Sequence, residues 1–206
     1  FFAEYNYNFK EKLNIITGLR ADYYNQQEKI YYSPRLHLKY NPNDKSALRF
    51  SIGKGFRISN ILIESMPFLA SNRKISINTR SNIESSINIG LNYSYCFYLF
   101  EREATFNFDI YNTQFDKQVI VDVENEGELN FYNLDGKSYS TSAQIDFSYE
   151  LFDNLDVKTA FKINRSFTKY SDGMKQTALT PISRGLINLA YKNNKENWKF
   201  DFTCNY

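Results

Sequence analysis

The sequence is poor in the residues that build several other protein classes. It has two cysteines, four prolines and one histidine among 206 residues. Two cysteines exclude a disulfide-stapled scaffold, and a lone histidine with no cysteine cluster argues against a metal centre. No stretch approaches the roughly 18–20 apolar residues of a membrane-spanning helix, and the mean hydropathy is −0.54. A helical membrane protein is therefore excluded too.

Charge of one sign is also lacking. Lys and Arg total 25 and Asp and Glu total 23, which gives a net charge of +2. Such a balance gives no electrostatic field for nucleic acid. The HExxH, GxSxG and Walker motifs are absent as well. We therefore expect no enzyme, no cofactor, no metal and no nucleic-acid partner.

Aromatic residues, in contrast, are abundant. The chain has 17 Tyr, 18 Phe and one Trp, which make up 17% of its residues. Disordered chains are poor in aromatics, so the chain is expected to fold. High aromatic content with a hydrophilic average is typical of a transmembrane β-barrel, because half of every strand faces water.

Apolar and polar residues alternate along most of the chain, which is the strand signal. Residues 83–95 and 138–151 are clear examples, each with one strongly polar face. Most of the roughly ten segments exceed the typical soluble strand of about 5–6 residues, and about 9–11 tilted residues cross a bilayer. We predict an all-β, antiparallel up-and-down meander of about ten long strands, part of a transmembrane β-barrel.

Short and long connections alternate between these strands. The short turns are expected near residues 10–12, 41–44, 100–102, 152–154 and 193–197, and the longer connections at 25–29, 58–82, 116–136 and 168–180. Outer-membrane barrels alternate in this way, whereas a Greek-key sandwich has no reason to. Aromatic residues gather beside the short turns, as in an interfacial girdle.

Six segments carry a family resemblance: IITGLRADYYN (15–25), YSPRLHLKYNPND (32–44), LRFSIGKGFRISN (48–60), ESSINIGLNYSY (84–95), FYNLDGKSYSTSAQIDFSYEL (131–151) and NWKFDFTCNY (197–206). They resemble the barrel domain of TonB-dependent outer-membrane receptors, particularly those of Bacteroidetes-type bacteria. The complete family is implied to have a plug inside a barrel of about 22 strands. Because both ends of the chain read as strands, we interpret residues 1–206 as one partial barrel domain that lacks the plug and terminal strands.

The resemblance also implies a function. Such receptors lie in the bacterial outer membrane, contact its lipid, and take up a scarce ligand: a siderophore, cobalamin, haem, peptide or glycan. Energy comes from a TonB-type inner-membrane coupler that acts through the missing plug, and glycan uptake would imply a surface lipoprotein partner. Two alternatives stay open on the residues alone. One is a passive porin-like or structural barrel of ten strands, and the other is a soluble all-β domain that binds a ligand or carbohydrate.

Basic and polar residues of three successive strands fall on one face, which would be the barrel lumen. The ligand-binding candidates are Arg20, Asp22, Arg35, His37, Arg49 and Arg57 on this wall, with Asn60 and Phe68 in the long loop. The alternative is a hydrated wall with internal ion pairs, such as Asp22 with Arg20 or Arg35. The loop 58–78 could contact ligand, fold over the barrel mouth or dock a partner, and 116–136 is predicted to be a hairpin beyond the membrane.

Two further expectations concern small residues. Gly53 and Gly55 would either admit a close backbone such as a plug or reflect strand curvature or a bulge near the rim. Cys96 and Cys204 fall on opposite faces by the alternation, so no disulfide is expected between them.

Overall fold

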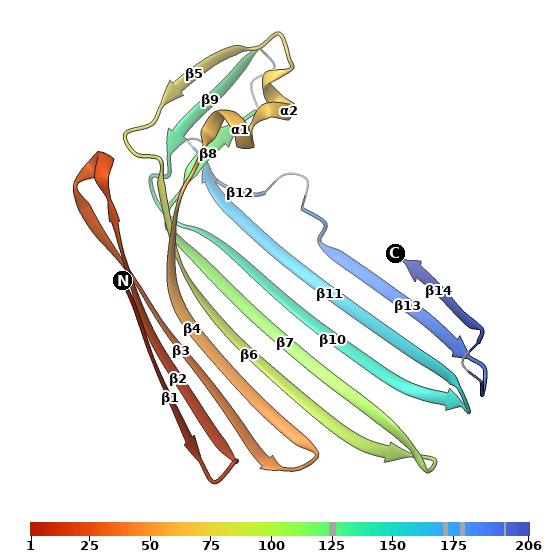
Figure 1. The fold of residues 1–206 in the computed structure, drawn as a ribbon. Coiled ribbons are helices and arrows are strands. Elements are labelled where there is room, and N and C mark those ends of the chain that lie inside the picture. The colour runs from red at the N-terminus through yellow and green to blue at the C-terminus, as the bar shows by residue number, and fades with distance from the viewer. Residues whose placement is uncertain (124–126, 171–172, 178–179, 196) are drawn as a thin grey trace.

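A strongly curved antiparallel sheet dominates the computed structural model, which describes residues 1–123, 127–170, 173–177, 180–195 and 197–206 (Figure 1). Ten strands follow one another in the order β1-β2-β3-β4-β6-β7-β10-β11-β13-β14, and β12 pairs with β11. We call this sheet the wall. Its strands are β1 (Phe2–Phe9), β2 (Leu13–Tyr24), β3 (Lys29–Asn43), β4 (Ser46–Ile58), β6 (Ile83–Leu99), β7 (Arg102–Lys117), β10 (Ser138–Phe152), β11 (Leu155–Tyr170), β12 (Gly173–Gln176), β13 (Ser183–Lys192) and β14 (Lys199–Asn205).

The predicted meander is confirmed, because each wall strand pairs antiparallel with its neighbour in the order of the wall. Strand β6 reaches 17 residues, far above the usual soluble length of about 5–6. The short turns lie where the sequence predicts them, although residue 196 of the last turn and parts of 168–180 lie outside the described residues. Positive φ at Lys10 and Glu11 and at Phe100 and Glu101 suits the twist of tight hairpins, despite the missing glycine.

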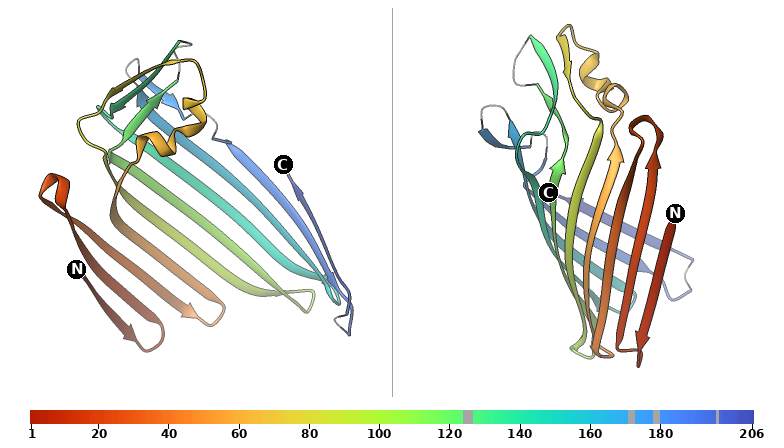
Figure 2. Two further views of the ribbon diagram at one scale, coloured as in Figure 1. Left: turned by 45° about the horizontal axis from the view of Figure 1, so that its top comes forward. Right: turned by 90° about the vertical axis from the view of Figure 1, so that its left-hand side faces the viewer.

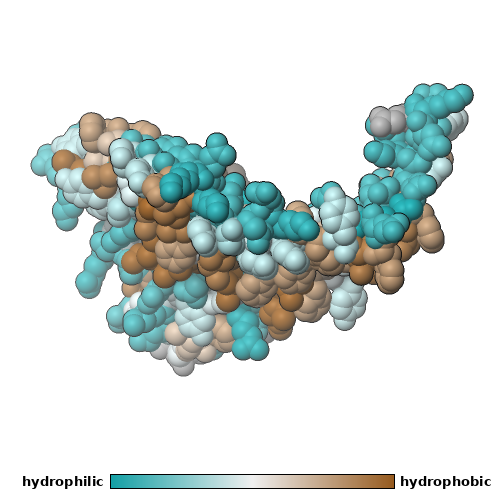
Figure 3. All heavy atoms as spheres, turned by 90° about the horizontal axis from the view of Figure 1, so that it is seen from below, coloured by the Kyte–Doolittle hydropathy of each residue, from teal (hydrophilic) through white to brown (hydrophobic). Residues whose placement is uncertain are grey.

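The two faces of the wall differ sharply in polarity. Figure 3 shows hydrophilic residues along the concave side of the arc and hydrophobic residues along its convex side. Large apolar side chains such as Ile89 and Ile145 are 43% and 47% exposed on the convex side. The strand register places each of them beside another apolar residue, because Ile89 pairs with Ile52 and Ile145 pairs with Phe161. Period-2 alternation in the sequence thus becomes one apolar and one polar surface.

A small second unit sits at the end of the wall opposite the short turns (Figure 1). It is built from the connections 59–82 and 118–137, and we call it the loop subdomain. It contains α1 (Ile61–Glu64), α2 (Met66–Leu69), β5 (Lys74–Asn78), β8 (Val119–Asp122) and β9 (Glu128–Asn133). Its sheet has the order β5-β9-β8, with β5 and β9 parallel. Within the described residues, no helix is long and apolar enough to span a membrane.

The loop subdomain departs from the sequence prediction in part. The β8–β9 hairpin is confirmed, although its tip at 124–126 lies outside the described residues. The helices and β5 were not predicted within 58–82, because helices of four residues show no periodicity. Nor does an antiparallel meander include the parallel β5–β9 pair. The strand total of the described residues therefore exceeds ten, because these three strands lie outside the wall and β12 adds an eleventh strand to the wall.

A gap opens between β3 and β4 toward the loop subdomain. Their pairing ends at Arg35 and Gly53, whereas β4 continues along β6 as far as Ile58 and Ile83. Pro34, which has no N–H to donate, lies where the β3–β4 ladder ends. The suggested bulge at Gly53–Gly55 is wrong, because the β4–β6 register runs unbroken there. The two strands simply diverge, as Figure 2 shows.

Candidate functional site

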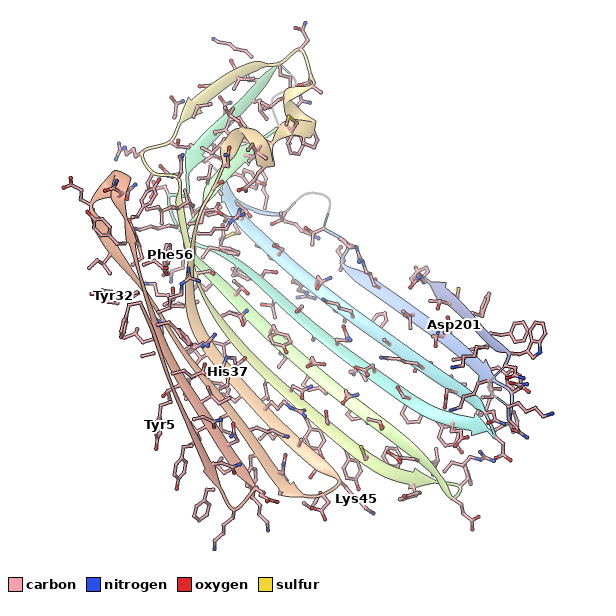
Figure 4. The ribbon with its side chains drawn as sticks, viewed as in Figure 1. Tyr5, Tyr32, His37, Lys45, Phe56 and Asp201 are labelled. Carbon is pink, nitrogen blue, oxygen red and sulfur yellow. The ribbon has the colours of Figure 1, made fainter. Side chains whose placement is uncertain are left out.

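A shallow hollow of about 660 Å³ lies on the concave wall and is lined in part by His37. Figure 4 labels His37 on β3. Strands β2, β3, β4, β6 and β7 line the hollow. Its polar lining includes Asn14, His37, Lys39, Arg49, Ser51, Asn92, Ser94, Asp109 and Tyr111. These side chains share one face because they pair across successive strands, as Lys39 with Arg49 and Arg49 with Asn92. The predicted common face of the basic residues is confirmed.

Hydrogen bonds tie the polar side chains of this hollow into a chain. Arg49 Nη1 donates to Asn92 Oδ1 at 2.7 Å, and Asn92 Nδ2 donates to Asp109 Oδ1 at 2.8 Å. A parallel row runs from Ser94 Oγ to Asn107 Oδ1 at 2.6 Å and from Asn107 Nδ2 to Asp146 at 3.0 Å. Such connected networks rigidify the groups that they join. The residues of these two rows are therefore held in place by their neighbours.

An aromatic ring closes the floor of the hollow over a glycine. Gly90 pairs with Tyr111 across β6 and β7. A Cβ atom built on Gly90 would lie 2.5 Å from Tyr111 Cε1 and 2.8 Å from Ser51 Oγ. Only glycine leaves room for the ring at this place, which is the reason for a small residue in mid-strand.

A second hollow of about 270 Å³ lies on the wall nearer the loop subdomain, and its lining includes Arg20, Asp22 and Arg35. Arg20 Nε contacts Asp22 Oδ2 at 2.6 Å, so the suggested Arg20–Asp22 pair is confirmed. Arg35 does not pair with Asp22 but with Glu4 of β1, at 2.6 Å. Its side chain crosses Gly18, where a Cβ would lie 2.7 Å from Arg35 Nε. Both cations are thus neutralised by local partners.

A third cluster joins the wall to the loop subdomain through Arg57. Its Nε contacts Glu84 Oε2 at 2.6 Å and its Nη2 contacts Glu64 Oε2 at 2.9 Å. Glu84 is only 8% exposed, and its other oxygen accepts a bond from Val119 N–H at 2.9 Å. One arginine therefore links β4, β6, α1 and β8.

Asn60 belongs to the same cluster as a helix cap. Its Oδ1 accepts from Ile63 N–H at 3.3 Å, and its own N–H donates to Glu64 Oε1 at 3.0 Å. Reciprocal bonds of this kind satisfy amide groups at the helix start. The Asn60 N–H bond, aided by the Arg57 charge, lowers the pKa of Glu64 although partial burial opposes the shift.

Apolar side chains are exposed on the two helices. Leu62, Ile63 and Met66 are 53%, 64% and 62% exposed, and Phe68 is 37% exposed. In the right-hand view of Figure 2 these helices lie on the same side of the loop subdomain as the concave face. They therefore overhang the polar wall.

The predicted site residues fall into separate groups rather than one pocket. Arg20, Asp22 and Arg35 share one hollow, and His37 and Arg49 share another. Arg57 and Asn60 both bind Glu64, and Phe68 lies on α2. Sequence reasoning gave no role to Glu4, Asn92 or Tyr111, which join these groups. The alternation of polar and apolar residues shows which face these side chains lie on. Only the register between strands shows what they contact.

Metal binding finds no support in the described part of the chain, which holds no group of three potential His, Cys, Asp or Glu ligands. The two cysteines are free. Cys96 lies beside Thr105 on the polar face, whereas Cys204 pairs with Ile187, an apolar residue 51% exposed. The prediction that they occupy opposite faces is confirmed.

A band of stacked rings covers the convex face near the short turns. Centroids of Tyr95 and Phe97 are 5.5 Å apart, and those of Phe147 and Tyr149 are 6.2 Å apart. Rings in such a band are suited to the interface between lipid and water. With an apolar convex face and a polar concave face, this band defines the class: the wall is part of a transmembrane β-barrel.

The family follows from comparison of the sequence with known families. Residues 1–206 match the family described as TonB dependent receptor-like, beta-barrel. The chain belongs to this family, whose members are outer-membrane receptors and transporters rather than enzymes. No curated protein sequence matches the chain.

Solved structures show the same fold. The FrpB iron transporter from Neisseria meningitidis matches with a TM-score of 0.66 and 13% identity over 99% of this chain and 32% of that one. The siderophore receptor PirA from Pseudomonas aeruginosa gives 0.58 and 13% over 98% and 40%. FpvA of P. aeruginosa, bound to heterologous pyoverdines, gives 0.59 and 14% over 100% and 30%. The chain therefore spans about a third of the length of these receptors.

Proposed function

We propose that residues 1–206 form part of the barrel wall of a receptor that takes up a scarce ligand across the bacterial outer membrane. The family match over the whole chain carries this proposal. The convex face meets membrane lipid, and the concave face meets a plug supplied by another part of the protein. A TonB-type inner-membrane partner supplies the energy through that plug.

A ferric siderophore is the first ligand candidate, because similar structures include an iron transporter, a siderophore receptor and a pyoverdine complex. Cobalamin, haem, a peptide or a glycan are the other candidates, and a glycan would require a surface lipoprotein. His37, Arg49 and Phe68 are the favoured contact residues. Arg49 donates to the neutral side chains of Asn92 and Ser94, whereas Arg20, Arg35 and Arg57 each contact a carboxylate. Asp22 and Asn60 are likewise engaged in contacts within the protein.

Uptake by cells with and without the gene tests this proposal. The probes are radiolabelled ferric enterobactin, ferric pyoverdine, haem and cobalamin, each measured with and without a protonophore. We expect one probe to accumulate only when both the gene and the proton gradient are present. Accumulation that needs the gene but resists the protonophore would favour a passive porin.

Cell fractionation separates the remaining alternative. A barrel should appear in the outer-membrane fraction and migrate differently on gels before and after heating. Recovery in a water-soluble fraction, with no heat-dependent migration, would instead support a soluble β-domain and contradict the receptor proposal.

A further inference from the structure

The two connections that form the loop subdomain, 59–82 (the first) and 118–137 (the second, which contains the β8–β9 hairpin), share one sheet. Strand β5 of the first pairs in parallel with β9 of the second, from Lys74 with Glu128 to Asn78 with Tyr132. Lys74 N–H also donates to Gly127 O at 2.9 Å. The backbone hydrogen bonds between β5 and β9 therefore need both connections. Separating them would expose the edges of both strands to water.

The apolar core of the loop subdomain also comes from both connections. Ile61 of α1 packs in one cluster with Val119, Leu129 and Phe131 of the hairpin. Leu129 and Phe131 are both 0% exposed. Removing large apolar side chains from water is the main driving force for forming such a core. Moving the first connection away would return part of this surface to water.

Polar side chains make a second link between the connections. Asn133 Oδ1 accepts from Arg80 N–H at 2.6 Å and from Ser81 N–H at 3.2 Å. Its Nδ2 donates to Ser81 O at 2.7 Å. Arg73 donates to Val123 O at 3.3 Å. One asparagine of the hairpin thus holds the backbone where the first connection returns to the wall.

We propose that the two connections open locally as one cooperative unit rather than independently of each other. Parallel pairing, a shared core and the Asn133 contacts make independent opening costly. Arg57 holds both parts to the wall, because it contacts Glu64 directly and reaches Val119 through Glu84. A molecule that displaces the helices must also move the hairpin. This coupling does not depend on which ligand is transported.

Amide hydrogen exchange on the receptor in detergent tests the proposal, with the Phe131→Ala variant. The substitution lies in the hairpin, so its effect on the other connection reports the coupling. We expect exchange at least about tenfold faster in 61–69 and 74–78 as well as in 119–122, because large-to-small core changes typically cost several kcal/mol. Faster exchange in the hairpin alone, with 61–78 unchanged, would overturn the proposal.

The matched control is Phe161→Ala, which removes the same ring from the convex wall, where it is 48% exposed. Exchange in 61–69 and 74–78 should then equal that of the native receptor. Equal acceleration in these segments by both variants would indicate general destabilisation and contradict a coupling specific to the shared core.

A crosslink gives an independent test should Phe131→Ala prevent folding. Ser76 and Asn130 face each other across β5 and β9, so Ser76→Cys with Asn130→Cys joins the connections, in a chain with Cys96→Ser and Cys204→Ser. Oxidation should slow exchange in 61–69 and in 119–122 together, and reduction should restore it. Oxidation that slows neither segment, or only one, contradicts a single cooperative unit.

Discussion

The wall and the loop subdomain bury apolar residues in opposite ways. The wall keeps large apolar side chains such as Ile89 and Ile145 about half exposed on its convex side. The loop subdomain encloses Leu129 and Phe131 completely. In lipid, the solvent itself is apolar, so a wall needs no interior core, whereas in water a core is the main driving force. Apolar residues of the wall are therefore suited to contact with lipid, whereas those of the loop subdomain cover one another.

Polar contacts show the same contrast. On the wall they run in rows across strands, as from Arg49 through Asn92 to Asp109. In the loop subdomain a single side chain holds the backbone of another segment, as Asn133 does with Arg80 and Ser81. The wall is held by many repeated contacts between paired strands, and the loop subdomain by a few contacts between its two connections. The latter is therefore the part that a single substitution can disrupt most.

Truncation of a leucine should have its largest effect in the loop subdomain. Leu129→Ala leaves a cavity in a closed core and should lower the stability of that unit by about 2–5 kcal/mol. Leu189→Ala, on the convex wall at 38% exposure, should cost less because lipid tails fill the space. Denaturant unfolding followed by hydrogen exchange measures both. Equal losses would contradict the contrast between the two regions.

A charge on the convex wall should have the next largest effect. Leu91→Arg places a cation in lipid and should destabilise the barrel by about 2–4 kcal/mol if the residue lies near the midplane. Ser142→Arg, on the concave face opposite Tyr111, should change stability by less than half of that. Folding yield in lipid vesicles distinguishes the two variants. A greater loss with Ser142→Arg would reverse the assignment of the faces.

Glycine substitutions sharpen the comparison within the wall itself. Gly90→Ala forces its Cβ against the Tyr111 ring and should cost about 1–3 kcal/mol. Gly55→Ala should be neutral or slightly stabilising, since no atom lies within 4 Å of its added Cβ. Thermal unfolding of the two variants is the measurement. A tolerated Gly90→Ala would show that the ring can move aside.

The smallest expected effect is the loosening of the Arg57 attachment by acid. The pKa of Glu64 is lower in the folded protein than its ordinary value of 4.5. Its contribution is therefore fully present above that value and is lost as the pH falls through the lower, folded value. Because the pair is exposed, the loss should stay below about 1 kcal/mol.

Thermal unfolding of the loop subdomain above and below that pH measures this effect. Arg57 and Glu84 are the charged groups beside Glu64 in this cluster. Glu64→Gln should remove this part of the pH dependence while leaving the Arg57–Glu84 contact in place. An unchanged pH profile in that variant would assign the effect to another carboxylate.

Sequence patterns predicted the wall well and the loop subdomain poorly. Alternation in segments such as 138–151 is a local signal, so the strands, faces and turns could be predicted from it. The helices at 61–69 are too short for any periodic signal, and the parallel partner of 74–78 lies about fifty residues away. The sequence left the role of the loop at 58–78 open, and it could not show that Ile61 packs against the hairpin.

For the candidate site, the sequence could place residues on a face but not beside one another. Arg35 was one of two suggested partners for Asp22, but it contacts Glu4 across Gly18. Arg49 was placed on the lumen face as a ligand candidate, but its bonds to Asn92 and Ser94 could not be predicted. Register decides such contacts, because a shift of two residues keeps the face and changes every neighbour.

The sequence by itself determined that this protein forms long antiparallel strands with one apolar and one polar face, because side chains alternate with a period of two residues. Only the tertiary structure decided which charges neutralise one another, where β3 and β4 separate, and that the two long connections fold into one body. Those features depend on contacts between residues distant along the chain, and local composition does not specify them.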